Sequence, residues 1–137
     1  MGYEYDLDCR VIAVAGWDVV TLPEWEDYLA AAAALPSDLR GAIEYVDLSE
    51  AFAIRMNEVG ALQLALWYEG LLQRGLEGTA ICAPNEAVYR TAGMIVSTCA
   101  RLGGGLPGGY RLTRHPLRLR GVRRFLSEGP EATPMVA

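Results

Sequence analysis

The chain has 137 residues, of which 52% are hydrophobic and 21% charged, and its formal net charge is −5 at pH 7. This length and composition predict one globular domain with a substantial core, and no apolar run is long enough to cross a membrane. The N-terminus is acidic and unlike a basic signal peptide, so we expect a cytoplasmic protein.

The twelve basic residues are all arginines, and they are unevenly distributed. Residues 1–110 contain 15 acidic residues and 6 arginines, a balance of −9, whereas residues 111–137 contain 6 arginines and 2 acidic residues, a balance of +4. A basic cluster on an acidic body is expected to pair within its own fold or to face solvent, because the remaining surface repels phosphate. We therefore expect no nucleic-acid partner.

The residue types that hold metals or cofactors are sparse. Cys9, Cys82 and Cys99 lie in apolar runs without C-x-x-C spacing, which indicates reduced core residues. His115 is the single histidine and cannot form a multi-histidine metal site. We expect no metal and no cofactor.

The N-terminal third alternates strand and turn signals. Residues 3–9 alternate apolar and acidic side chains, which is typical of an edge strand, and residues 11–15 predict a buried strand. Residues 16–20 are expected to turn the chain. Thr21 and Glu24 then have the spacing of a capping box, which predicts the start of an alanine-rich helix.

The centre of the chain carries the strongest pattern. A nearly continuous apolar run over residues 42–48, interrupted only by Glu44, predicts a central strand covered on both faces. A loop over residues 49–56 should follow, and Asn57 can cap the next helix. Because residues 59–72 are apolar nearly all round, this helix is expected to lie deep against the sheet.

One stripe of this helix contains Gly60, Gln63, Gly70 and Arg74, with Trp67 among them. Either the stripe packs beneath another element, or Trp67 is an exposed anchor for a partner. A tryptophan flanked by glycines allows close approach of a second copy, so we expect a homodimer. The competing explanation is that the final helix or its arginines cover Trp67 within one subunit.

The C-terminal third predicts a strand, a helix, a strand and a last helix. Residues 79–83 form a short buried strand, and the next helix, capped by Asn85, should bury Val88, Ala92, Ile95, Cys99 and Leu102. The glycine-rich residues 103–109 join a helix to a strand, the reverse of a phosphate-binding loop, so they are expected to be a connector. After a strand over residues 110–113, Pro116 fits the first turn of a helix that buries Leu119, Val122, Phe125 and Leu126.

The order of elements predicts an α/β fold with a small, mostly parallel sheet of about five strands, four helices and one antiparallel edge strand. A single domain should span residues 1–127, followed by a disordered tail over residues 128–137. Asp47 lies near the end of a parallel strand, where α/β proteins place ligands, and Glu50, Asn57 and Glu58 could converge with it. No clear nucleophile or base accompanies them, so we expect no enzyme.

Four segments resemble the STAS fold of anti-sigma-factor antagonists, and more closely the divergent SpoIIAA-like bacterial proteins. They are RVIAVAGWDVVTLPEW, EYVDLSEAF, AICAPNEAVYRTAGMI and YRLTRHPLRLRGVRRFL, and the resemblance extends over about residues 3–126. It implies a non-catalytic bacterial regulatory module that binds a protein partner. Because the SpoIIAA-like group also resembles lipid-binding folds, the alternative is a carrier or sensor of a small hydrophobic ligand or lipid.

In the antagonists, the loop after D-L-S leads to an aspartate and a phosphorylatable serine. When Asp47-Leu48-Ser49 is laid on that motif, Arg55 takes the aspartate position and Met56 the serine position, with Asn57 next. We therefore expect a module without the phosphorylation switch, although Ser49 remains as a hydroxyl. The residues expected to contact a partner are Ser49, Arg55, Met56, Asn57, Glu58 and Trp67.

Overall fold

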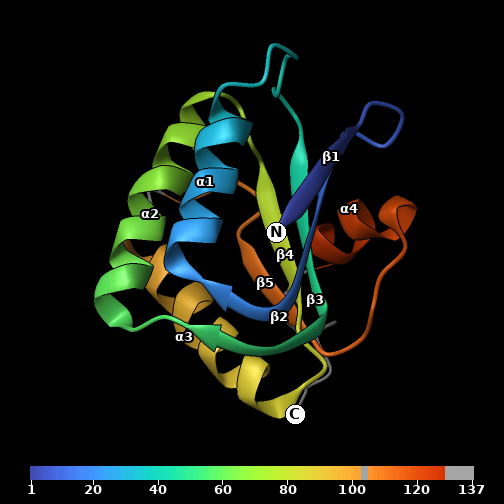
Figure 1. Ribbon diagram of the computed structural model, residues 1–137. Helices are drawn as coiled ribbons and strands as arrows, with labels where there is room; N and C mark the ends of the chain where they lie inside the picture. The colour runs from blue at the N-terminus through green and yellow to red at the C-terminus, as the bar shows by residue number, and fades with distance from the viewer. Residues whose placement is uncertain (103–104, 129–137) are drawn as a thin grey trace.

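The computed structural model describes residues 1–102 and 105–128, and its elements follow the expected order along the chain (Figure 1). The strands are β1 (Gly2–Asp6), β2 (Val11–Thr21), β3 (Ile43–Arg55), β4 (Gly78–Cys82) and β5 (Tyr110–Thr113). The helices are α1 (Leu22–Ala33), α2 (Glu58–Gln73), α3 (Glu86–Leu102) and α4 (Leu119–Ser127). Within the described residues, the predicted α/β class with five strands and four helices is confirmed.

The strands form one mixed, mostly parallel sheet in the order β1-β2-β3-β4-β5. β1 runs antiparallel to β2, and every other neighbouring pair is parallel. The predicted central position of residues 42–48 is confirmed, because β3 pairs with β2 on one side and with β4 on the other. Glu44 is thereby placed in the middle of the sheet, between Ile12 and Thr79.

The helices cover the two faces of the sheet unequally (Figure 1). α1, α2 and α3 pack on one face and bury the larger core, which includes Trp25, Leu29, Leu64 and Tyr68. α4 packs alone on the opposite face, over a smaller cluster that includes Val11, Ile43, Tyr45, Val122 and Leu126. Because α4 has only nine residues, it covers part of that face.

β2 and β3 continue well beyond the rest of the sheet, and this overturns two predictions. The expected turn over residues 16–20 is strand, and the expected loop over residues 49–56 is strand as far as Arg55. The two extensions pair with each other from Trp17 to Thr21, with two register shifts. Gly16 permits this close pairing, because a β-carbon there would lie 2.9 Å from the Leu48 side chain of β3. The glycine therefore marks an irregularity within a strand rather than a turn.

The predicted helix starts of α1 and α2 are confirmed. The Thr21 side chain accepts a hydrogen bond from the Glu24 backbone N–H, and Glu24 completes the capping box. Asn57 caps α2 by accepting a 2.9 Å bond from the Gly60 N–H. The predicted start of the last helix at Pro116 is wrong, because α4 begins at Leu119.

Most of the expected inward positions are buried. Val88, Ala92, Ile95 and Cys99 of α3 lie in the larger core, whereas Leu102 is 52% exposed and that prediction is wrong. In α4, Val122 and Leu126 are buried, and Leu119 and Phe125 are half-buried against them. Within the expected tail, residues 129–137 lie outside the described residues, as do residues 103–104 of the expected connector.

Candidate functional site

The expected partner-binding residues lie at three separate places. Ser49 is exposed within β3, and its backbone N–H donates a 2.9 Å hydrogen bond to the Asp47 carboxylate. Arg55 ends the same strand six residues later, so at about 3.3 Å per residue it lies at most roughly 20 Å from Ser49. Trp67 lies in the middle of α2. The expected convergence of Asn57 and Glu58 with Asp47 is wrong for the same reason, since β3 continues to Arg55.

At the start of α2, structural roles take up two of the expected contact residues. Asn57 uses its side chain as the helix cap. Met56 is half-buried, and its side chain would lie 2.8 Å from a β-carbon built on Gly60. Arg55 and Glu58 are exposed. Of the expected contact residues here, Arg55 and Glu58 therefore remain available to a partner.

Trp67 packs within its own chain. Its ring is half-buried against the larger core, and its indole N–H donates a 3.2 Å hydrogen bond to Glu26 of α1. The sequence offers the final helix as the element that covers Trp67, but α4 lies on the other face of the sheet. α1 contacts Trp67 instead. The stripe that contains Trp67 is mixed, because Gly60 is buried while Gln63 and Gly70 are exposed.

An exposed apolar surface lies on the outer side of α2. Val59, Leu62 and Leu66 are 62%, 42% and 69% exposed, and their spacing of three and four residues places them on one helical face. We call these three residues the α2 surface. The prediction that residues 59–72 lie deep is wrong, because α2 is an outer-layer helix that buries only its opposite face, with Ala61, Leu64, Ala65, Tyr68 and Leu71. An all-round apolar helix signals either deep burial or, as here, an uncovered apolar face.

The sheet also contains a buried carboxyl group that the sequence pattern did not single out. Glu44 is fully buried, and it accepts hydrogen bonds from the Tyr28 hydroxyl at 2.5 Å, the Tyr68 hydroxyl at 2.7 Å and the Thr79 hydroxyl. Burial raises the pKa of Glu44, and the three hydrogen bonds oppose that rise. Every polar partner of this carboxyl comes from the core, so it is placed to hold elements together.

Asp47 and its neighbours offer little reactive chemistry. Cys82 pairs with Asp47 across the β3–β4 ladder, and burial raises the pKa of its thiol to about 11. Burial likewise raises the pKa of Cys99 to about 12, so neither thiol is an effective nucleophile at neutral pH. Among residues 1–102 and 105–128, no three histidine, cysteine or acidic side chains come together in a group that could hold a metal ion.

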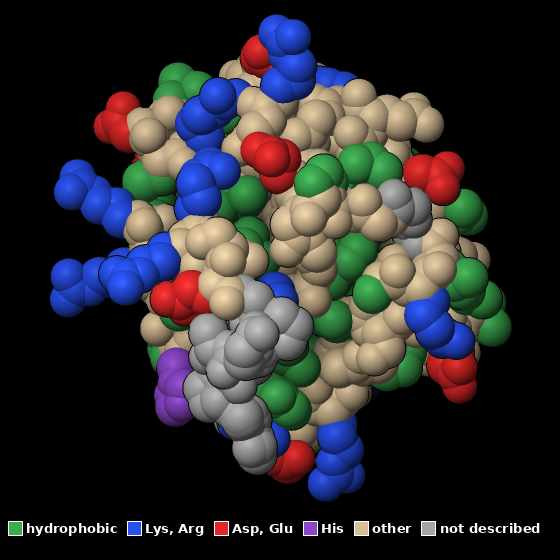
Figure 2. Space-filling model, turned by 180° about the vertical axis from the view of Figure 1, so that it is seen from behind, with side chains coloured by type: hydrophobic (Ala, Val, Ile, Leu, Met, Phe, Trp, Pro, Cys, Tyr) green, Lys and Arg blue, Asp and Glu red, His purple; other side chains and the backbone are tan. Residues whose placement is uncertain are grey.

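Several C-terminal arginines bind within the fold, as the charge pattern predicts. Arg123 donates hydrogen bonds to the carbonyls of Cys9, Arg10 and Gly41, which fastens α4 to the sheet. Arg114 pairs with Glu86 and lies over the Tyr89 ring. From behind, arginine side chains gather toward one margin of the molecule, with acidic side chains between them (Figure 2). This mixture of charges does not favour a polyanionic partner.

Comparison of the chain with protein-family models, curated proteins and solved structures finds no match. In the part of the chain that the structure describes, no helix has both the length and the apolar character required to span a bilayer.

Proposed function

We propose that this protein is a non-catalytic, cytoplasmic regulatory module of the STAS-like bacterial type that binds another protein through the α2 surface. The partner segment is an amphipathic helix with an apolar seam and basic flanks. The single observation that carries the proposal is the exposure of Val59, Leu62 and Leu66 on one face of an ordered helix. Such a face matches the helix-packing mode in which apolar residues at helical spacing interlock.

The charges beside the α2 surface favour a basic partner. Glu58 and Glu69 lie on the same side of the helical wheel as Leu62, and both are exposed. A second copy packed antiparallel on this face would bring Glu58 of one subunit toward Glu69 of the other, and like charges disfavour that contact. The predicted homodimer is therefore the weaker choice of partner for this surface and remains an outcome that the experiment distinguishes.

The non-catalytic part of the proposal is supported by Glu44. It is the carboxyl group with the most developed hydrogen-bond environment, yet it is fully buried and cannot contact a substrate from solvent. The proposal also excludes a phosphorylation switch at the start of α2, because Met56 and Asn57 have no hydroxyl group. We also propose that Ser49, which lies within β3, is not a phosphorylation switch. Mass spectrometry of protein isolated from its native host tests this directly, and a stoichiometric phosphate on Ser49 would overturn it.

The test of the partner surface uses the double variant Leu62→Gln/Leu66→Gln. Proteins from the native host captured by the wild type are identified, and the partner is purified and titrated calorimetrically against each variant. We expect the affinity to fall at least about tenfold, since burial of each leucine contributes roughly 1.5–3 kcal/mol. The affinity for the wild type should also weaken with salt because of Glu58 and Glu69.

Leu102→Gln is the matched control, since Leu102 is equally apolar and 52% exposed but lies at the end of α3. Equal loss of binding in the control and the double variant would contradict the proposal, and so would full binding by the double variant. Sedimentation of the wild type and Trp67→Ala tests self-association separately. A wild-type dimer that Leu62→Gln/Leu66→Gln dissociates would replace the basic partner with a second copy.

A further inference from the structure

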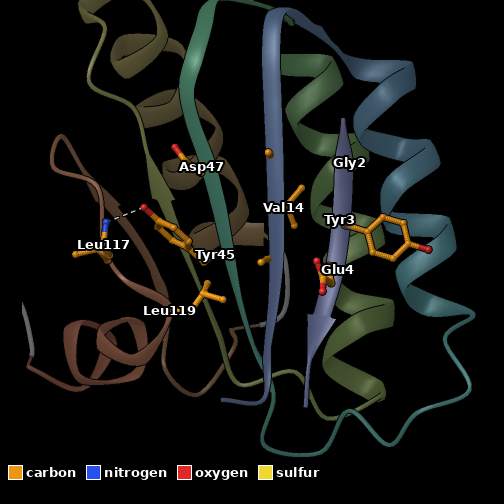
Figure 3. Close-up of a pocket in the computed structure, with 10 residues that line it drawn as sticks. Gly2, Tyr3, Glu4, Val14, Tyr45, Asp47, Leu117 and Leu119 are labelled. Atoms are coloured by element: carbon orange, nitrogen blue, oxygen red, sulfur yellow. Dashed lines mark hydrogen bonds between the residues drawn. The ribbon is translucent and has the colours of Figure 1, made fainter. Parts of the chain in front are cut away.

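The face of the sheet beside α4 contains an open groove of about 460 Å³ (Figure 3). Its floor consists of two rows of residues in register across β1, β2 and β3, namely Glu4–Ala13–Tyr45 and Gly2–Ala15–Asp47. Leu117 and Leu119 line it from the α4 side. A volume of this size lies within the range of small-molecule sites.

The groove exists because small residues meet an incomplete helical layer. Gly2, Ala13 and Ala15 leave the middle of the floor low, and α4 begins only at Leu119. The wall is held in place by Tyr45, whose hydroxyl accepts a 2.8 Å hydrogen bond from the Leu117 backbone N–H (Figure 3). The hollow is therefore built by ordered strands and by a wall fastened to the sheet.

The polar lining of the groove is anionic. Glu4 on β1 and Asp47 on β3 lie on opposite sides of β2, and the described residues that line the groove include no arginine. In the described part of the chain, neither carboxylate forms an ion pair, and Asp47 accepts only the hydrogen bond from the Ser49 N–H. Two carboxylates that form no close ion pair, placed beside a low-dielectric wall, attract a cation more strongly than they would on an open surface.

An exposed aromatic ring adjoins the same groove. Trp17 is 51% exposed, and a β-carbon built on Gly2 would lie 3.5 Å from its ring. Gly2 belongs to the floor row that ends at Asp47. The face of an indole ring attracts organic cations, so this side chain adds to the same preference.

We propose that the groove is a binding site for a small organic cation, an amine with an apolar body. The apolar body lies on Ala13 and Ala15 against Leu117 and Leu119, and the ammonium group faces Glu4 or Asp47. The sequence leaves open a carrier or sensor of a small hydrophobic ligand, and the groove adds a positive charge to the chemistry of that ligand. The inference does not rest on the proposed protein partner, because the groove and the α2 surface are on opposite faces of the sheet.

Three probes of matched size separate charge from apolarity: phenethylammonium, the neutral 2-phenylethanol and the anionic 3-phenylpropanoate. Each is titrated into the ¹⁵N-labelled full chain, and the backbone amide shifts are followed by NMR. Phenethylammonium should shift the amides of Ala13, Ala15 and Asp47 saturably, and its affinity should fall with added salt. The neutral probe should bind about fivefold more weakly or worse, and the anion should not bind.

The variants Glu4→Gln and Asp47→Asn should each weaken phenethylammonium binding by about fivefold. Ala15→Leu should abolish binding by filling the exposed floor without altering the core. Glu69→Gln on α2 is the matched control and should bind as the wild type does. Equal binding of the cation and the anion would overturn the proposal. So would chemical-shift changes that do not include the amides of Ala13, Ala15 and Asp47. Unchanged affinity in both carboxylate variants would do so as well.

Discussion

The Tyr68 hydroxyl donates a 2.7 Å hydrogen bond to Glu44, which fastens the middle of α2 to the central strand of the sheet. The same hydroxyl accepts a 3.3 Å hydrogen bond from the Trp25 indole of α1, and Tyr28 of α1 also donates to Glu44. Two helices and the central strand therefore share one polar cluster inside an apolar core. Such a cluster stabilises one arrangement of the helices only when each member is satisfied.

The first prediction concerns the pH dependence of stability through Glu44. Burial raises the pKa of this group above its ordinary value of 4.5, so the folded protein holds the proton more tightly than the unfolded chain does. Its stabilising contribution is thus complete below pH 4.5 and is lost as the pH rises through the raised pKa. Urea denaturation gives the free energy of unfolding of the wild type and of Glu44→Gln at each pH. As the pH rises above 4.5, the wild type should lose stability relative to Glu44→Gln. A constant difference would contradict this prediction.

The second prediction separates tyrosines with buried hydrogen bonds from one whose hydrogen bond is exposed. Tyr28→Phe or Tyr68→Phe removes one donor to Glu44 and should lower the free energy of unfolding by about 1–3 kcal/mol, because the carboxyl group stays buried. Each variant should also have a steeper pH dependence than the wild type, since one hydrogen bond that opposes the rise in pKa is gone. Tyr5→Phe is the control, as its hydroxyl makes only an exposed 3.4 Å contact with the Asp38 carbonyl. Equal stability of the three variants would refute the proposed role of the cluster.

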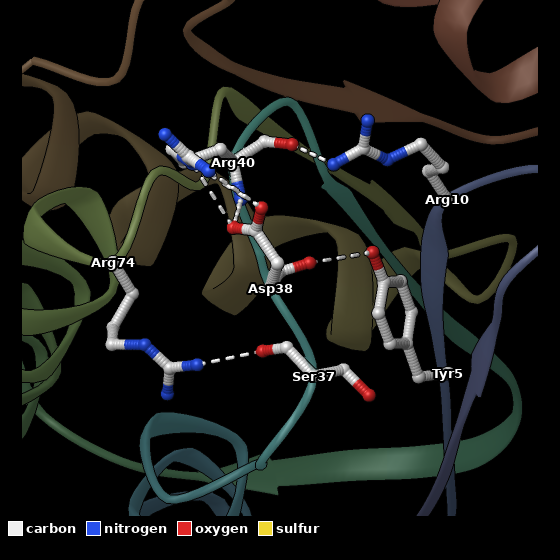
Figure 4. Close-up of polar contacts among 6 residues, drawn as sticks. All are labelled: Tyr5, Arg10, Ser37, Asp38, Arg40 and Arg74. Atoms are coloured by element: carbon white, nitrogen blue, oxygen red, sulfur yellow. Dashed lines mark hydrogen bonds and ion pairs between the residues drawn. The ribbon is translucent and has the colours of Figure 1, made fainter.

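The third prediction concerns Arg74 at the end of α2 (Figure 4). Its guanidinium donates to the backbone carbonyls of Ala33, Leu35 and Ser37 at distances of 2.5–2.9 Å, so it satisfies the C-terminal end of α1 and the segment that follows. Arg74→Met should cost about 1–3 kcal/mol of unfolding free energy. Arg40→Met, which breaks an exposed pair with Asp38, should leave the free energy of unfolding nearly unchanged. Thermal and urea denaturation measure the stability of both variants. Similar losses of stability would show that the hydrogen bonds of Arg74 to the end of α1 do not stabilise the protein.

The fourth prediction uses three glycines with different surroundings. A β-carbon on Gly70 in α2 or on Gly121 in α4 would meet no atom within 4 Å, so alanine at either position should stabilise the protein by about 0.5–1 kcal/mol. Gly75 has a φ of +102°, and a β-carbon there would lie 2.6 Å from the Arg40 backbone. Gly75→Ala should therefore destabilise strongly. Calorimetric melting shows whether each of the three variants is more or less stable than the wild type. A stabilised Gly75→Ala protein would contradict this account.

Much of the fold was predictable because its signals are local. The Thr21–Glu24 capping box and the Asn57 cap predict the starts of α1 and α2, and the alternation of strands and helices predicts the parallel sheet. The long strands were not predictable, because Gly16 is typical of a turn. Here β2 and β3 satisfy each other's backbone groups beyond the sheet, so a tertiary pairing overrides the local preference.

The candidate sites were less predictable, because their parts come from distant segments. Glu44 is a single polar residue in an apolar run, and its partners Tyr28, Tyr68 and Thr79 are 16, 24 and 35 residues away. The α2 surface does have a local signal in the spacing of Val59, Leu62 and Leu66. The same spacing suits a buried helix. Whether this face is buried or exposed depends on whether another element packs outside α2, which the local sequence does not show. The partner proposal rests on the α2 surface, and the ligand proposal rests on the groove beside α4.

The strand order β1-β2-β3-β4-β5 has a consequence for synthesis on the ribosome. Each strand emerges next to one that is already in place, so the sheet can grow from one edge as the chain lengthens, without waiting for a later strand to be inserted. α4 emerges after all five strands, and until it docks, Val11 and Ile43 on the second face remain uncovered by it. A nascent chain halted before α4 would therefore expose this apolar face to chaperones, and release of the last helix would be the step that frees the protein from them.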